Sequence, residues 1–363
     1  MRPAAGVNSS DIKQRNLSAI LLHLLRQGSA SRVRLAQQIG VSTATITNLV
    51  NELVAVGLIA EDGLARDLDA AVQVGRPQRA LKLIADARLA VGVHIDVGRV
   101  HVALIDLCGA PLATTSYEHS LDTPWQQVLD RAVFQAEQLC HRHAADPDRV
   151  VGVGVAASGL VDPISGVNTL SPNLHWYAVP IRDYMAERLQ RPVAVENNVR
   201  AMALGESMFG SGRDLRAMAF LYARVGVGAG LVVDGQIYRG ADAGAGEIGH
   251  TALVVQPRRG KPSVRSLEDM LSHQALIDAA QALGRPHAAL DDLFAAAADG
   301  AADLQAMLEE RAFYFGLALA NLIGLFNPEL IVLGGLFLHE RGPLLPTIER
   351  TMRDYAFGTL GKR

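Results

Sequence analysis

The 363-residue chain has few cysteines, few aromatic residues and almost no net charge. Two cysteines, Cys108 and Cys140, are too few for a disulfide framework or a metal centre built from cysteine alone, which favours a reducing cytoplasm. The N-terminus has no basic segment followed by an apolar one, so we expect no signal peptide. The longest nearly unbroken apolar run, residues 312–326, is shorter than the roughly 20 residues of a membrane span. We therefore expect a cytoplasmic protein with no membrane partner.

The composition is that of a folded protein, with 49% hydrophobic and 20% charged residues, and the length indicates two or three domains. The net charge of −3 hides an asymmetry. Residues 1–85 carry 10 basic and 6 acidic side chains, whereas the rest of the chain carries 24 and 31. A basic N-terminal module on an acidic body is typical of a protein whose N-terminus binds nucleic acid.

The N-terminal residues follow the pattern of a helix-turn-helix. Apolar residues recur at helical spacing in three stretches that end at Gly28, Gly40 and Gly57. Ala36 allows two helices to cross closely, and Gly40 accepts the left-handed conformation that the turn needs. Short polar side chains suited to phosphates and base edges lie at the start and outer face of the third stretch: Ser42, Thr43, Thr45, Thr47 and Asn48.

Two short apolar segments, residues 58–60 and 81–84, are expected to pair as the strands of a wing. The turn Gly75-Arg76-Pro77 between them would present Arg76, with Arg79 nearby, to a narrow minor groove. We therefore predict a winged helix-turn-helix domain over residues 1–86. A three-helix protein-interaction module with a solvated polar face is the alternative, but the helix spacing, the glycine position and the polar face together favour DNA binding.

The remaining residues, 87–363, have the pattern of an α/β domain made of two similar lobes. A strand over 91–96, a glycine turn and a strand over 102–107 recur 128 residues later, so that Val97-Gly98 corresponds to Val225-Gly226. Helices are expected around 128–141, 200–209 and 310–326. The cleft between two such lobes is the default ligand site.

Several motifs in this body resemble those of the ROK family, in which sugar kinases and sugar-responsive repressors share an actin-like, ribonuclease H-like two-lobed fold. The N-terminal helix-turn-helix and Gly75-Arg76-Pro77 resemble the regulator branch, in particular the xylose-repressor and N-acetylglucosamine-repressor types. The motifs that carry the resemblance are Gly152-Val153-Gly154-Val155, Ser158-Gly159-Leu160-Val161-Asp162, Ser171-Pro172-Asn173, Glu196-Asn197-Asn198, Gly240–His250, Asn327-Pro328-Glu329 and Leu333-Gly334-Gly335.

The chain departs from the kinases of this family where they perform chemistry. Family kinases have an Asp as general base at the position of Asn198, and the loss of such a base costs about 10²–10⁴-fold in rate. The loops that resemble the kinase phosphate loops, residues 96–100 and Gly226-Val227-Gly228, lack a glycine and the expected hydroxyls. We therefore expect no enzymatic activity, with an active ROK sugar kinase that carries a DNA-binding arm as the alternative.

The family's structural zinc site is also expected to be absent. By resemblance, its cysteine positions are occupied by Arg259, Lys261 and Ser266, so that of the ligands only His250 remains. A single histidine beside two cations is a poor tetrahedral zinc site. We expect no metal and no cofactor.

The sugar end of the cleft is retained. Polar groups there would hydrogen-bond vicinal hydroxyls, although Glu247 and His250 could instead pair simply to stabilise a loop. By resemblance, the sugar-binding residues are Ser158, Gly159, Asn173, Asn197, Asn198, Glu247, His250 and Glu268.

We interpret the chain as a DNA-binding regulator, a repressor of carbohydrate-utilisation genes, modulated by a sugar or phosphosugar in a degenerate kinase cleft. A homodimer or dimer of dimers would bind a pseudo-palindromic double-stranded operator with half-sites roughly 34–36 Å apart. A third hypothesis is a regulator with a vestigial cleft, controlled by a partner protein.

Overall fold

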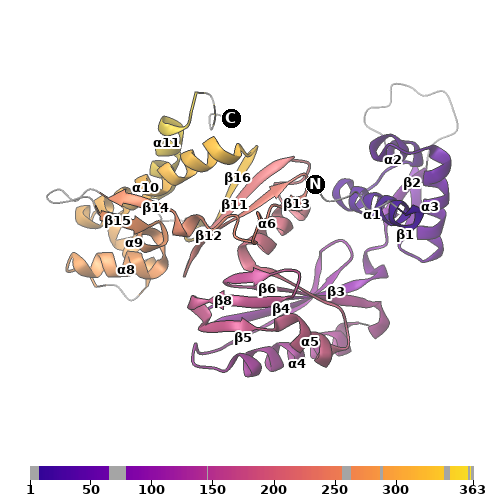
Figure 1. The fold of residues 1–363 in the computed structure, drawn as a ribbon, viewed down its shortest axis with the longest axis horizontal. Helices are drawn as coiled ribbons and strands as arrows, with labels where there is room; N and C mark the ends of the chain where they lie inside the picture. Colours follow the sequence, from indigo (N-terminus) through magenta and orange to yellow (C-terminus); the bar gives the residue numbers. More distant parts are fainter. Residues whose placement is uncertain are drawn as a thin grey trace.

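The computed structural model describes residues 8–64, 79–144, 146–255, 263–286, 289–338, 344–358 and 360. These residues form an N-terminal helical unit and two α/β lobes, the three bodies visible in Figure 1. No helix within the described ranges is long and apolar enough to cross a membrane.

The N-terminal unit packs three helices on a two-stranded antiparallel sheet. The predicted apolar stripes meet in one core, where Ile20, Leu35 and Ile46 are fully buried. Gly40 has φ +76° and ends the second helix in the left-handed conformation, so the predicted turn is present. Arg76 and its turn lie outside the described residues. The elements are α1 (Ser9–Gln27), α2 (Arg32–Ile39), α3 (Thr43–Ala55), β1 (Ile59–Leu64) and β2 (Arg79–Leu83).

The first lobe is built on a five-stranded mixed sheet in the order β10-β6-β3-β4-β5. β3 pairs antiparallel with β4 and parallel with β6, which in turn pairs parallel with β10. The carboxyl ends of β3, β6 and β10 therefore meet at one edge of the sheet. Helices α4 and α5 cover one face (Figure 1). The elements are β3 (Leu89–Asp96), β4 (Arg99–Asp106), β5 (Pro111–Glu118), α4 (Trp125–His143), β6 (Val150–Ala157), β7 (Leu160–Asp162), β8 (Val167–Ser171), β9 (Trp176–Val179), α5 (Ile181–Leu189) and β10 (Val193–Asn197).

The second lobe is built on a four-stranded sheet in the order β13-β12-β11-β16. α6 covers one face through Ala203, which packs beside Met218 and Val232, and the opposite face packs against α10. The elements are α6 (Asn198–Phe209), β11 (Ala217–Ala223), β12 (Val227–Val233), β13 (Gln236–Ile237), β14 (Ala252–Val255), β15 (Ser263–Ser266), α7 (Glu268–Leu271), α8 (His273–Ala282), α9 (Leu290–Ala298), α10 (Ala302–Phe326), β16 (Leu330–Gly335) and α11 (Leu344–Tyr355).

Each lobe contains one copy of the predicted strand–turn–strand repeat. β3 and β4 pair antiparallel around Val97-Gly98, and β11 and β12 pair antiparallel around Arg224–Gly226. Only the first copy has its glycine at positive φ, +79° at Gly98. The helix expected around 310–326 begins earlier, at Ala302, because the buried side chains Leu304 and Leu308 continue the helical pattern toward the N-terminus.

The N-terminal unit contacts the second lobe through α1. The Gln27 side chain donates a hydrogen bond from Nε2 to Asp214 Oδ1 at 2.7 Å, in the loop that follows α6. The Arg26 guanidinium lies against Gly235 in the β12–β13 turn, where a Cβ atom would be 2.1 Å from its Nη2. Burial lowers the pKa of His23 on the same helix, and the Arg34 charge adds to this effect.

Candidate functional site

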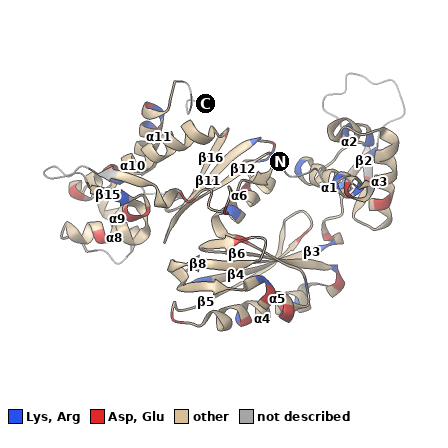
Figure 2. Cartoon of the chain, in the orientation of Figure 1, with Lys and Arg blue, Asp and Glu red and all other residues tan. Residues whose placement is uncertain are grey.

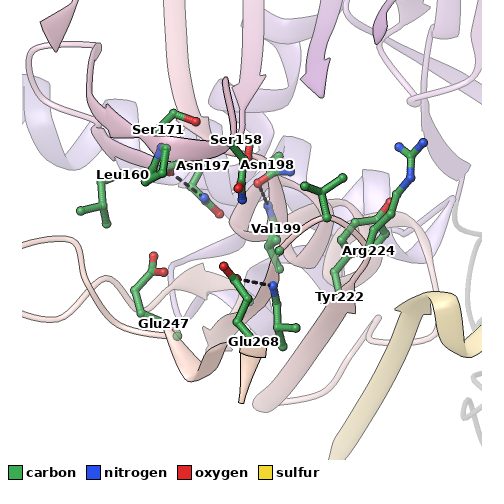
Figure 3. A pocket seen from close by; sticks show the side chains of 18 of the residues that line it. Ser158, Leu160, Ser171, Asn197, Asn198, Val199, Tyr222, Arg224, Glu247 and Glu268 are labelled. Carbon is green, nitrogen blue, oxygen red and sulfur yellow. Dashed lines mark hydrogen bonds between the residues drawn. The ribbon is translucent and has the colours of Figure 1, made fainter. Parts of the chain in front are cut away.

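A cavity of about 230 Å³ lies between the two lobes. In Figure 3 its upper wall includes Ser158 and Asn197, at the ends of β6 and β10 of the first lobe, and Asn198, the first residue of α6. Glu247 and Glu268 of the second lobe form the lower wall. The volume is below the roughly 300–1,000 Å³ of sites for drug-sized ligands, so the cavity suits a smaller molecule.

The structure brings all of the predicted sugar-binding residues to this one cavity. Residues more than a hundred positions apart meet there because the β6 and β10 ends of the first lobe face the β11–β12 turn of the second. The predicted residues that line it are Ser158, Gly159, Asn173, Asn197, Asn198, Glu247, His250 and Glu268.

Gly159 shapes the upper wall through its backbone. Its φ is +98°, and a Cβ atom would lie 2.5 Å from both the Leu170 carbonyl oxygen and the Ser171 Cβ. Its own carbonyl oxygen accepts a hydrogen bond from Asn197 Nδ2 at 2.9 Å. Only glycine fits this position without moving the wall.

The two asparagines differ in how much of their side chains the protein already uses. Asn197 caps α6 by accepting a hydrogen bond from the Arg200 backbone N–H at 3.1 Å, while its Nδ2 donates to Gly159. Asn198 Oδ1 accepts from the Val199 backbone N–H at 2.9 Å, and its Nδ2 makes no hydrogen bond within the described residues. Asn197 therefore organises the wall, and Asn198 retains a donor for a ligand.

The lower wall carries two carboxylates. Glu268 Oε2 accepts a hydrogen bond from the Val227 backbone N–H at 2.8 Å, and both carboxylates point toward the upper wall in Figure 3. Burial raises the pKa of Glu247, and the nearby Glu268 raises it further, whereas Arg200 and His250 oppose the shift. Glu247 and His250 form no side-chain ion pair in the described structure, and their direct contact is a backbone hydrogen bond from the His250 N–H to the Glu247 carbonyl oxygen at 3.2 Å.

Several lining residues were absent from the predicted set, among them the polar residues Asp96, Ser171, Tyr222 and Arg224. Ser171 is fully buried, and its hydroxyl has no hydrogen-bond partner among the described residues. Its place immediately before Pro172-Asn173 was the available signal. Arg224 Nη1 pairs with Asp96 Oδ2 across the lobes. The available signal for Arg224 was its charge at a position between an apolar strand and a glycine turn. That signal did not identify its partner, Asp96.

The loop that would hold zinc in the family is described only in part. Arg259 and Lys261 lie outside the described residues. Ser266 ends β15, and its hydroxyl accepts a hydrogen bond from the Asp269 backbone N–H at 3.1 Å. Its own N–H donates to Asp269 Oδ2 at 3.0 Å. At this position, which the family resemblance assigns to a zinc ligand, the side chain instead hydrogen-bonds the first turn of α7.

The predicted DNA-binding residues lie along one side of α3 and at its start. Thr43, Thr45 and Asn48 are exposed, whereas Thr47 is half-buried and donates its hydroxyl to the Thr43 carbonyl oxygen at 2.8 Å. The exposed Ser42 hydroxyl caps α3 by accepting from the Thr45 backbone N–H at 3.1 Å. Figure 2 shows basic residues on α1 and α2, while the sequence of α3 contains none.

Two of the described arginines near the β1–β2 hairpin are already paired. Arg79 and Arg32 both contact Glu61, with N–O distances of 2.8 and 2.7 Å. Arg79, expected at the minor groove, therefore shares one carboxylate with Arg32, and its side chain is 65% exposed. Arg76 lies outside the described residues.

Two bacterial regulators are similar to most of the chain. The xylose repressor of Caldicellulosiruptor bescii is 26% identical over 341 residues, which cover 90% of this chain and 84% of the repressor. The DNA-binding transcriptional dual regulator NagC of Escherichia coli K12 is 27% identical over 360 residues, which cover 95% of this chain and 86% of NagC.

Solved structures include both regulators and kinases of similar fold. A ROK-family transcriptional regulator, homologous to the MLC protein of E. coli, has a TM-score of 0.80 at 28% identity and covers 97% of this chain and 90% of its own. A ROK glucokinase from Streptomyces griseus, solved with glucose and AMPPNP, has a TM-score of 0.60 at 26% identity and covers 74% of this chain and 90% of its own. The mixed sheets and two lobes are thus the actin-like, kinase-type fold. Residues 90–363 match the model of the ROK family, and the chain therefore belongs to that family.

Proposed function

We propose that this protein is a DNA-binding transcriptional repressor of carbohydrate-utilisation genes, controlled by a sugar in the cavity between its lobes. In this proposal, residues 1–86 are a winged helix-turn-helix domain and residues 87–363 are a sensor without kinase activity. The protein acts in the cytoplasm as a homodimer or a dimer of dimers.

The extent of the structural similarity carries this proposal. The ROK regulator covers 97% of the chain, which includes the N-terminal unit. The glucokinase covers 74%, a share close to that of residues 90–363 alone. The similarity to the xylose repressor and to NagC likewise extends over 90% or more of the chain. A kinase body joined to a helix-turn-helix unit is the arrangement of a regulator.

The exposed side of α3 is the proposed reader of DNA sequence. Thr43, Thr45 and Asn48 are short and polar, and an amide such as Asn48 can donate to and accept from an adenine edge in the major groove. Because α3 has no basic residue, phosphate contacts would come from α1, α2 and the wing. Two such units in a dimer would bind half-sites about 34–36 Å apart.

The proposed coupling runs along α6. This helix begins at Asn198 in the cavity, and the loop after it contacts α1 through Asp214 and Gln27. A sugar that bridges the lobes would shift α6 and with it the N-terminal unit. To release DNA, the sugar must bind the DNA-incompetent arrangement more tightly. A difference of about 1–3 kcal/mol weakens operator binding roughly 5–150-fold.

Selection of binding sites from random DNA duplexes with the full-length protein tests the DNA function. We expect a pseudo-palindromic site whose affinity falls steeply with salt concentration. Titration of the selected site with a panel of sugars and phosphosugars tests the sensor. Failure to enrich any sequence would overturn DNA recognition. Enrichment without an effect of any sugar, together with no sugar binding in calorimetry, would favour control by a partner protein.

A sugar kinase with a DNA-binding arm is the second candidate, favoured by the likeness to the glucokinase. ATP consumption by the full-length protein across the same sugars separates the two functions. We expect no turnover, because Asn198 cannot accept the sugar proton as a carboxylate would. Turnover by the natural sequence would establish an enzyme, whereas turnover only in Asn198→Asp would support a lost general base.

A further inference from the structure

An ion pair closes one end of the cavity. The Asp96 side chain, 9% exposed at the end of β3, receives the Arg224 guanidinium of the opposite lobe at Oδ2. Its Oδ1 accepts a hydrogen bond from the Val97 backbone N–H at 2.8 Å, so both oxygens are in use. Tyr222 lies beside Arg224 and also lines the cavity. In Figure 3, Arg224 lies at the opposite side of the cavity from Glu247.

This end of the cavity is formed by the turns that resemble the phosphate loops of ROK kinases. Val97 follows Asp96 in the first turn, and Val225–Gly228 form the second. A phosphate placed between these turns would meet an arginine that already has a carboxylate partner. The ion pair therefore takes the place where the fold could otherwise receive a phosphate.

The remaining charges of the cavity do not favour an anion. Arg200 is 1% exposed, and its guanidinium is engaged by Glu196 Oε1 at 2.8 Å and by the Val161 carbonyl oxygen at 3.3 Å. Glu247 and Glu268 form no salt bridge among the described residues. Within this part of the chain, each arginine that lines the cavity has a carboxylate partner, although Glu196 also binds Arg239, whereas Glu247 and Glu268 have no salt-bridge partner.

We propose that the Asp96–Arg224 ion pair excludes phosphate from this cavity and makes the effector an uncharged monosaccharide. The inference rests on the proposed function, because it names the chemical class of the sugar that the sensor binds. Sugar hydroxyls donate short hydrogen bonds to Glu247 and Glu268, because an ionised carboxylate accepts hydrogen bonds and donates none. A phosphosugar would have to displace Asp96 from Arg224 and approach carboxylates of the same charge.

Isothermal titration of the full-length protein with matched sugars tests the class of effector. Glucose, mannose and N-acetylglucosamine are each compared with their 6-phosphates, and xylose with its 5-phosphate. We expect one uncharged sugar to bind at least about tenfold more tightly than its phosphate. Equal or tighter binding of a phosphosugar would overturn the inference while leaving the sensor function intact. No binding by any probe would overturn the sensor function and the inference together.

Asp96→Asn gives a second test, because its expected result would not be seen if the ion pair only stabilised the fold. The amide keeps the oxygen that accepts from Val97 N–H but removes the charge that neutralises Arg224. The ratio of affinities should shift toward the phosphosugar by roughly tenfold or more. The matched control is Asp96→Asn with Arg224→Ala, in which the shift should disappear because the cation is gone. Thermal melting is used to check that both variants fold. An unchanged ratio of sugar affinity to phosphosugar affinity in folded Asp96→Asn would overturn the inference.

Discussion

Glu247 combines a half-buried carboxylate with a place in the ligand cavity. Its pKa is raised above the ordinary value of 4.5, mainly because burial penalises the charged form. The folded protein thus binds more protons than the unfolded chain above that value, so this group contributes less stability as pH rises. A ligand that donates hydrogen bonds to the carboxylate favours the charged form and offsets this cost.

Sugar affinity is therefore expected to rise with pH from 4.5 until Glu247 is fully ionised, and then to level off. Titration calorimetry across this range measures the effect. In Glu247→Gln, the binding free energy of the sugar should weaken by about 1.5–3 kcal/mol at neutral pH, and the rise of affinity with pH should be lost. Glu187→Gln, at an 82% exposed carboxylate, is the matched control. An unchanged pH dependence in Glu247→Gln would assign the titration to another group.

Ser42 and Asn48 are both exposed polar residues of the α3 region, but they are expected to act differently. Ser42→Ala removes the helix cap and should cost about 1 kcal/mol of unfolding free energy, measured by urea denaturation. Asn48→Ala should leave stability nearly unchanged and reduce discrimination between the selected operator and single-base variants by about 1–3 kcal/mol. Competition binding with these duplexes measures the discrimination. Equal discrimination by Asn48→Ala would remove this residue from the reading surface.

At the scale of elements, α6 lies unusually close to β12. A Cβ atom at Gly230 would lie 2.4 Å from the Ala203 Cβ and 2.8 Å from the Val199 carbonyl oxygen. Gly230→Ala should therefore displace the helix and destabilise the protein by about 1–3 kcal/mol, measured by urea denaturation. Gly154→Ala in β6 is the control, because no atom lies within 4 Å of its Cβ position. Equal stability of the two variants would contradict this packing argument.

The helices and hairpins could be predicted from the sequence because their signals are local. Apolar spacing and the glycine at position 40 were enough for α1 to α3, and the grouping of cavity residues followed from the family resemblance. The Asp96–Arg224 pair could not be found in this way, since its members are 128 residues apart and belong to different lobes. Likewise, nothing in the short polar pattern around Asn197 distinguished a helix cap from a free ligand-binding amide.

At the scale of the whole molecule, the contact between α1 and the loop after α6 is the expected transmission point. Gln27→Ala removes the hydrogen bond to Asp214 but lies outside both the cavity and α3. We expect nearly normal operator affinity and sugar affinity, with a sugar effect on DNA binding reduced from about 5–150-fold toward unity. Operator titrations with and without sugar measure this coupling.

Gln274→Ala is the matched control, because Gln274 also donates to an aspartate, Asp278 Oδ1 at 2.7 Å, on the exposed surface of α8. In Gln274→Ala, the effect of sugar on operator binding should equal that in the natural protein. Full coupling in Gln27→Ala would mean that the signal reaches the N-terminal unit by another route.

The turn between β4 and β5 touches the far end of α6. A Cβ atom at Gly109 would lie 2.5 Å from the Phe209 ring, and the exposed thiol of Cys108 immediately precedes this glycine. Cys140, the second cysteine, is less accessible. A fluorescent dye attached to Cys108 would therefore lie beside α6, which begins in the cavity and whose following loop contacts the N-terminal unit. The natural sequence thus contains its own attachment point for an optical reporter of lobe movement, with no engineered cysteine required.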